Sequence, residues 1–109
     1  MKTDRQRAAR RKWKRNNPDK VAHSKRNGRL KREYNITIAQ YDTMHLYQGG
    51  VCAICGLANQ RGQRLAVDHD HKTSKVRGLL CDLCNRGLGL FGDNQTRLLK
   101  ALLYLRLRS

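Results

Sequence analysis

Two Cys-x-x-Cys pairs constrain the fold of this chain more than any other feature. The pairs are Cys52 with Cys55 and Cys81 with Cys84, and 25 residues separate them. Each pair places two thiolates on one turn of backbone, and four thiolates close a tetrahedral site of the kind that holds zinc. Such a site supplies folding free energy, with apparent binding of roughly 10–16 kcal/mol in small zinc peptides. The spacing predicts a zinc-stapled core, and the alternative is two unrelated pairs of buried or redox-active thiols.

A four-cysteine zinc site has no open coordination position, so chemistry would have to come from other residues. Between the two pairs lie Asp68, His69, Asp70 and His71 in succession. In extended backbone the two aspartates face one side and the two histidines the other. A ligand for a hard cation and an imidazole base can flank one phosphate only if the strand curves or ends here. The alternative is a solvated polar turn beside a zinc ribbon.

The charge of the chain predicts a polyanionic partner. Lysine and arginine number 24 against 8 acidic residues, which gives a net charge of +16. Residues 1–33 alone hold 14 basic and 3 acidic side chains, with a break at Asn16-Asn17-Pro18. We expect a basic N-terminal arm over residues 1–33, either two helices joined by a turn or a disordered segment, that contacts nucleic-acid phosphates. A solvated, flexible tail is the alternative, and Trp13 either stacks on a base or closes the helix pair.

The hydropathy pattern argues against export or membrane insertion. The chain has no run of 18 or more apolar residues and no apolar leader at its N-terminus. We therefore expect a cytoplasmic protein, or one of the host cytoplasm if a phage encodes it, with reduced cysteines available as metal ligands.

Local signals place the secondary structure. Thr37 and Gln40 form a capping box for a helix that runs to about Gln48 and ends at two glycines. Residues 65–69 and 75–80 read as two short strands around a turn at 72–74. Residues 85–91 are expected to be helical, and Asp93 or Asn94 caps a last helix to about residue 108. This last helix carries a leucine stripe that either packs on the zinc unit or mediates dimerisation: Leu98, Leu99, Leu102, Leu103 and Leu105.

Several of these motifs, in this order, resemble the recombination endonuclease VII family of phage nucleases over roughly residues 34–105. The similar segments are Gly-Gly-Val-Cys-Ala-Ile-Cys at 49–55, Val-Asp-His-Asp-His at 67–71, Val-Arg-Gly-Leu-Leu-Cys at 76–81 and Cys-Asn at 84–85. The resemblance implies an α+β fold: a small zinc-stapled ββα-metal core, also called the His-Asn-His (HNH) or His-Me finger core, with flanking helices. It places the nuclease domain at residues 34–109, after the arm.

The same resemblance implies roles for individual residues. Asp68 and Asn85 would bind a catalytic Mg²⁺ or another divalent cation, His69 would be the general base, and the four cysteines would hold structural zinc. His71 belongs to the pattern, but its role is open between binding the scissile phosphate, orienting a neighbour and packing. Leu88 stands where the pattern leads us to expect an acidic residue, which puts a supporting carboxylate in doubt. The arm lies outside the similar region, so substrate structure does not carry over.

Two functions are consistent with these features. The first is a metal-dependent DNA endonuclease that hydrolyses phosphodiester bonds, with branched or nicked DNA as candidate substrates. The second is a non-catalytic zinc-ribbon DNA-binding protein, for which the cysteines and the basic arm suffice. A zinc hydrolase of another class is disfavoured because the four cysteines occupy the evident zinc site. The resemblance also favours a homodimer through the last helix, since the junction-resolving member of the family acts as a dimer.

Overall fold

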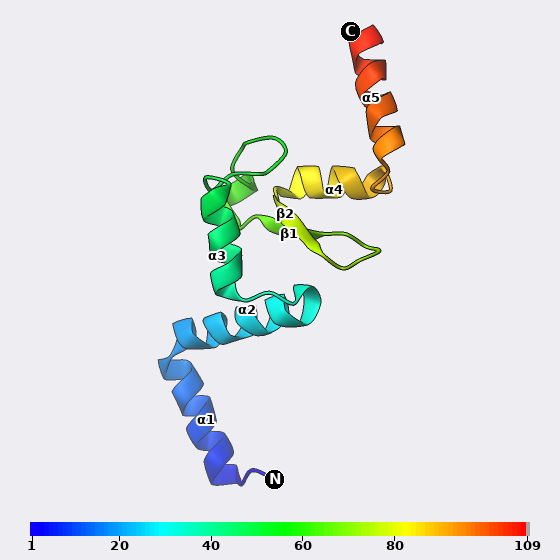
Figure 1. The fold of residues 1–109 in the computed structure, drawn as a ribbon. Helices are drawn as coiled ribbons and strands as arrows, with labels where there is room; N and C mark the ends of the chain where they lie inside the picture. The colour runs from blue at the N-terminus through cyan, green and yellow to red at the C-terminus, as the bar shows by residue number, and fades with distance from the viewer. Residues whose placement is uncertain (109) are drawn as a thin grey trace. The chain divides into compact units, whose positions relative to one another are not determined.

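The structure is a computed structural model that describes residues 1–108 (Figure 1). Ser109, the last residue of the expected nuclease domain, lies outside the described residues. The chain divides into two compact units, Met1–Asp42 and Thr43–Ser109. Within residues 1–108 the elements are five α-helices, one short 3₁₀ helix and one two-stranded sheet, so the protein is a small α+β protein as expected. The functional division expected at residue 33 stays a prediction.

The N-terminal arm is helical. Helix α1 spans Asp4–Asn16 and α2 spans Pro18–Tyr34, and the break at Asn17 is the one that the sequence predicts. Thr3 and Gln6 form a capping box at the start of α1, while Pro18 occupies the first turn of α2, where its missing N–H costs nothing. Capping at the ends therefore favours these two helices, whose polar sequences bury few side chains.

Helix α3 spans Ile38–Tyr47 and begins as expected. The Thr37 hydroxyl accepts from the Gln40 N–H at 3.1 Å, and the Gln40 side chain accepts from the Thr37 N–H at 2.8 Å. In the first unit Ile38 and Tyr41 are buried with Leu30 of α2. The Arg26 guanidinium lies 4.8 Å from the centre of the Tyr41 ring, a cation–π contact.

The second unit is built around an antiparallel hairpin. Strand β1 (Ala66–His69) pairs with β2 (Val76–Leu80), with Ala66 opposite Leu80 and Asp68 opposite Gly78. The register shifts between Asp68 and His69, at the end of β1. The sequence interpretation required the strand to curve or end at this point, and it does.

Two helices follow the hairpin. Helix α4 (Asp82–Leu90) contacts β1, and α5 (Gln95–Arg108) begins after a short turn. The Asn94 side chain accepts from the Arg97 N–H at 2.9 Å, so Asn94, and not Asp93, caps α5. A 3₁₀ helix, η1 (Gln60–Gly62), lies in the loop before β1. None of these described helices combines the length and apolar character that a membrane crossing requires.

The apolar core of the second unit is small, as the composition predicts. Its buried residues are few and two of them are cysteines: Cys52, Leu65, Val67, Leu79, Leu80 and Cys81. A core of this size gives little stability without a disulfide or a structural metal site. Most of the leucine stripe on α5 is not covered, because Leu98 is half-buried whereas the other members are exposed: Leu99, Leu102, Leu103 and Leu105.

Candidate functional site

The four cysteines converge on one point of the second unit. Their sulfur atoms all lie within 4.8 Å of one another, and the Sγ atoms of Cys55 and Cys81 are 3.8 Å apart. Four sulfurs placed about 2.3 Å from a tetrahedral zinc would be about 3.8 Å from each other. Cys52 and Cys55 lie on the tight turn before η1, whereas Cys81 caps α4 and Cys84 lies in its first turn.

The local backbone prepares these sulfurs to carry negative charge. The Ile54 N–H donates to Cys52 Sγ and the Cys84 N–H donates to Cys81 Sγ, each at 3.4 Å. Burial raises the pKa of the Cys52 thiol, but backbone hydrogen bonds with Cys55, Cys81 and Ile54 outweigh it and bring the pKa down to about 6. Burial and the neighbouring thiols raise the pKa of Cys84 to about 12.

These opposite shifts are typical of interacting thiols, because the first thiolate to form opposes the next. A divalent cation at the centre would remove that opposition and allow all four to ionise. In donor type, number and spacing the cluster therefore fits structural zinc.

A buried asparagine ties this cluster to the loop before β1. Asn59 Nδ2 donates to the Arg64 carbonyl at 2.9 Å and to Asp82 Oδ1 at 3.3 Å. Its Oδ1 accepts from the N–H groups of Gln60 and Asp82 at 2.9 and 3.0 Å. Asn59 thus connects the first cysteine turn to the start of α4, where the second cysteine pair lies.

The Asp-His-Asp-His segment divides into different environments. Asp68 and His69 end β1 and are half-buried, whereas His71 is exposed, with its ring centre 4.8 Å from that of His69. Asp70 closes the hairpin turn, because its Oδ1 accepts from the N–H groups of Lys72 and Thr73 at 2.8 and 3.2 Å. These backbone N–H groups also lower the pKa of Asp70. Asp70 therefore stabilises the hairpin turn by accepting hydrogen bonds from the backbone, as aspartate commonly does in turns.

Asn85, the other expected ligand of a catalytic cation, is exposed on α4, the helix that contacts β1. The topology thus brings the element that carries Asn85 against the one that carries Asp68 and His69. An amide oxygen and a carboxylate suit a hard cation such as Mg²⁺, which keeps several of its own waters. The donor chemistry fits this type of ion.

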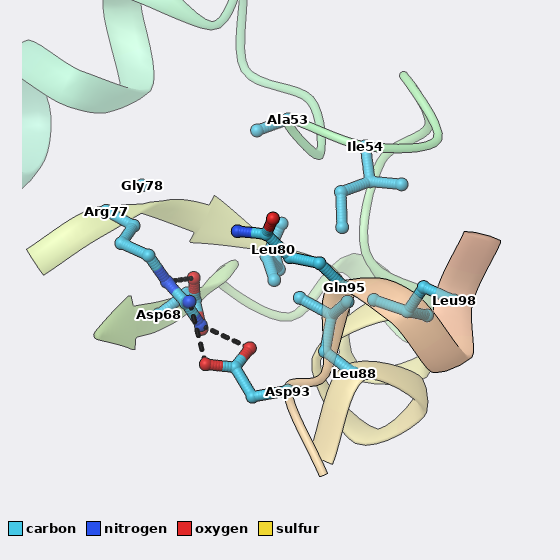
Figure 2. Close-up of a pocket in the computed structure, with 10 residues that line it drawn as sticks. All are labelled: Ala53, Ile54, Asp68, Arg77, Gly78, Leu80, Leu88, Asp93, Gln95 and Leu98. Atoms are coloured by element: carbon cyan, nitrogen blue, oxygen red, sulfur yellow. Dashed lines mark hydrogen bonds and ion pairs between the residues drawn. The ribbon is translucent and has the colours of Figure 1, made fainter. Parts of the chain in front are cut away.

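The carboxylate of Asp68 accepts a bidentate, or two-pronged, hydrogen bond from Arg77 of β2 (Figure 2). Arg77 Nε donates to Asp68 Oδ2 at 2.7 Å and Nη2 donates to Oδ1 at 3.0 Å. The other edge of the guanidinium donates to both oxygens of Asp93, at 2.8 and 2.9 Å. The hydrogen bonds that Arg77 donates to Asp68 and Asp93 raise the pKa of Arg77, and those to Asp93 lower the pKa of that carboxyl.

These three side chains line a cavity of about 310 Å³ beside the hairpin (Figure 2). Leu88 lines the same cavity, so the position where we expected a carboxylate is apolar, while Asp93 brings a carboxylate from the turn before α5. The remaining residues of the wall come from the first cysteine turn, β2 and α5: Ala53, Ile54, Gly78, Leu80, Gln95 and Leu98.

Comparison with known proteins identifies the family. The family model for recombination endonuclease VII matches residues 27–107, which hold the cysteines, the hairpin and both following helices. The chain belongs to the recombination endonuclease VII family. The resemblance noted from the motifs is thereby confirmed, and most of the basic arm lies outside the matched region.

Two proteins that are similar to this endonuclease VII family chain come from mycobacterial phages. The Gene 59 protein of Mycobacterium phage D29 is 48% identical over 79 residues, which cover 72% of this chain and 48% of that protein. The Gene 59 protein of Mycobacterium phage L5 is 52% identical over 58 residues, 53% of this chain and 35% of that protein. The chain thus spans about half or less of the length of these relatives.

A separate basic cleft lies within the first unit of this endonuclease VII family chain, between α1 and α2. Trp13 and Val21 line it together with the polar residues Arg10, Lys14, Lys20, Ser24 and Lys25. Trp13 is 49% exposed, so its ring both packs in the helix pair and presents surface to solvent. None of the residues that line this cleft is acidic.

Sequence reasoning missed four side chains that organise these sites. Arg77 bridges Asp68 and Asp93. Asn59 holds the loop after the first cysteine turn to the start of α4, and Gln48 holds the start of that turn to β2. Asn59 does carry a local signal, because an asparagine before a Gln-Arg-Gly turn is a recognisable cap. Arg77 and Asp93 carry no local signal that pairs them, since they are 16 positions apart in the sequence.

Proposed function

We propose that this chain is a divalent-metal-dependent DNA endonuclease with a ββα-metal (HNH, or His-Me finger) active site. The observation that carries the proposal is the placement of Asp68 and His69 at the end of β1, against the helix that bears Asn85, in a chain of the endonuclease VII family. The chain order β1, β2, α4 is that of a ββα core. The cysteine cluster joins the loop before β1 to the start of α4 and would hold zinc to stabilise this core.

In the proposed mechanism each residue has a separate task. The carboxylate of Asp68 and the amide oxygen of Asn85 would hold the cation, and the imidazole of His69 would accept a proton from the attacking water. A bound Mg²⁺ would stabilise negative charge that develops on the phosphate and on the leaving oxygen. His71, whose exposed ring lies beside that of His69, would donate a hydrogen bond to a phosphate oxygen.

DNA is the proposed partner, and the arm of residues 1–33 would contact its phosphates. The arm forms two helices with basic residues over their whole length, and its cleft combines a half-exposed tryptophan with four cationic side chains. Contacts of this kind give affinity independent of sequence, which fits a substrate recognised by structure, such as branched or nicked DNA. The exposed leucines of α5 would form the interface of a homodimer.

A cleavage assay tests the proposal. Supercoiled plasmid and a four-way DNA junction are incubated with the zinc-loaded protein in Mg²⁺, in Mn²⁺ and in the same buffer with neither cation added. We expect Mg²⁺-dependent cutting, a loss of at least about 100-fold in His69→Ala, and normal cutting in His45→Ala, which changes an exposed histidine on α3. DNA binding should persist in His69→Ala. Tight binding without cutting in any divalent metal would instead favour the zinc-ribbon DNA-binding protein.

A further inference from the structure

Arg77 makes four short hydrogen bonds to two carboxylates that come from different segments. Asp68 lies on β1, Arg77 on β2 and Asp93 in the turn before α5, and the four N–O distances lie between 2.7 and 3.0 Å. A planar guanidinium that fills both of its edges in this way is fixed in orientation. The carboxylate plane of Asp68 is fixed with it, because both oxygens of Asp68 accept from the same group.

This arrangement leaves Asp68 able to bind a cation. A carboxylate has about four lone-pair sites, and Arg77 uses two of them. An arginine alone beside a cation ligand would repel the cation. Asp93 offsets this repulsion, because the two carboxylates and one guanidinium together carry a net charge of −1.

The exposure of the three side chains favours a role directed at Asp68. The Arg77 and Asp93 side chains are 36% and 27% exposed, whereas that of Asp68 is 12% exposed, so Arg77 reaches from the surface to a mostly buried carboxylate. Asp93 also has φ of +56°, a left-handed conformation that is uncommon for a residue other than glycine. The cap of α5 does not need Asp93, since Asn94 provides it.

We propose that Arg77 is a positioning residue that orients Asp68 toward the catalytic cation, and that Asp93 anchors and neutralises Arg77. The inference rests on the proposed function, because it takes Asp68 as a cation ligand. Partners that orient a metal ligand typically change metal affinity or activity by roughly 10–100-fold when they are mutated. Asp93 acts here through Arg77 and does not touch the cation.

The experiment measures the binding of Mn²⁺, as a probe for the cation, to the zinc-loaded full chain by electron paramagnetic resonance of free Mn²⁺. Asp93→Asn keeps the shape of the side chain and removes its charge, and we expect it to weaken Mn²⁺ binding by roughly tenfold or more. Asp42→Asn, an exposed aspartate of α3, removes the same charge elsewhere and should bind Mn²⁺ like the unmodified chain. An unchanged Mn²⁺ affinity in Asp93→Asn would overturn the proposal.

A double-mutant comparison tests whether Asp93 acts through Arg77. In an Arg77→Met background, Asp93→Asn should have little further effect on Mn²⁺ affinity, because the group that it anchors is gone. Effects of Arg77→Met and Asp93→Asn that simply multiply would overturn the indirect role. If Asp93→Asn does not fold, Arg77→Lys is measured in its place. Lysine keeps the charge but cannot form the two-pronged contact, so Mn²⁺ affinity should again fall, and an unchanged affinity would overturn the proposal.

Asp68→Asn separates this inference from the proposed function. Loss of Mn²⁺ binding in Asp68→Asn, together with normal binding in Asp93→Asn, would remove the role of Asp93 and leave the proposed ligand in place. Normal Mn²⁺ binding in Asp68→Asn would remove the proposed ligand itself.

Discussion

The side chain of Gln48 pairs with the backbone of Leu79 at both of its polar groups. The Leu79 N–H donates to Gln48 Oε1 at 2.9 Å, and Gln48 Nε2 donates to the Leu79 carbonyl at 2.9 Å. The same Nε2 donates to the Val51 carbonyl at 2.9 Å. Leu79 is fully buried and lies in β2, opposite Val67. One glutamine after α3 thus pairs with the backbone of β2 and fixes the start of the cysteine turn.

We predict that Gln48→Ala lowers the free energy of unfolding by about 1–3 kcal/mol, because it leaves the buried Leu79 N–H without its partner, whereas the Leu79 carbonyl keeps the Ala53 N–H. Urea unfolding of the zinc-loaded protein, followed by circular dichroism, measures this change. Gln63→Ala removes an exposed glutamine from the neighbouring loop and should change stability by less than about 0.5 kcal/mol. Equal stability of the two variants would refute the assigned role of Gln48.

The contact between Gln48 and Leu79 illustrates what the sequence could not provide. Elements with local signals were predicted well: the Thr37 capping box, the helix break at Asn17, the hairpin strands and the convergence of the cysteines. Each depends on residues a few positions apart or on a ligand spacing known from other zinc sites. The Gln48 contact joins residues 31 positions apart, and no pattern in either segment marks it.

Asp93 and Asn94 show the same limit at the candidate site. The sequence allows either residue to cap α5, because both types are good N-caps. The structure assigns the cap to Asn94 and turns Asp93 toward Arg77. That choice depends on where β2 lies relative to the turn, which is tertiary information. The expected roles of Asp68, His69, His71 and Asn85 rest on the family pattern and stay predictions.

A second prediction concerns Asn59, the buried polar side chain between the cysteine turn and α4. Asn59→Asp would place a carboxylate next to Asp82 Oδ1, where Nδ2 now donates at 3.3 Å, and would remove the donor to the Arg64 carbonyl. We expect a loss of about 2–4 kcal/mol of stability at neutral pH, since a partly buried charge meets a like charge. Gln60→Glu adds the same charge one residue later at an exposed position and serves as the control in the same urea experiment. A smaller loss in Asn59→Asp than in Gln60→Glu would contradict the role of Asn59.

Removal of zinc should unfold the second unit. A structural zinc site contributes roughly 10–16 kcal/mol in small peptides, which equals or exceeds the total stability of about 5–15 kcal/mol of an ordinary domain. With so few buried aliphatic side chains, the metal-free unit should lose its cooperative thermal transition. Circular dichroism melting before and after chelation, with zinc added back as the control, measures this change, and elemental analysis should give one zinc per chain. A cooperative transition that survives complete removal of zinc would count against a structural metal.

The exposed leucines of α5 predict self-association. Leu99 and Leu103 lie four residues apart on one face, with exposures of 56% and 45%, and Leu102 is 43% exposed. Replacement of Leu99 and Leu103 by lysine should convert a dimer into a monomer in sedimentation-equilibrium experiments, because the apolar face becomes charged. Leu46→Lys changes another exposed leucine, on α3, and should leave the dimer intact. A wild-type chain that is monomeric at concentrations of tens of micromolar would exclude a stable homodimer through this face.

The cleft between α1 and α2 predicts two separable contributions to DNA binding. Phosphate contacts by Lys14 and Lys25 should make the logarithm of the affinity fall with the logarithm of salt concentration, with a slope of about 0.9 per contact on duplex DNA. Replacement of both lysines by glutamine should therefore lower that slope by up to about two. Trp13→Ala should leave the salt slope almost unchanged, because stacking releases no counterions, and should weaken binding by about 1–3 kcal/mol where unpaired bases are accessible. Fluorescence anisotropy on matched duplex and single-stranded oligonucleotides measures both effects. Equal losses on the two substrates in Trp13→Ala would mean that Trp13 only closes the helix pair, whereas a selective loss on single strands would assign base stacking to its exposed face.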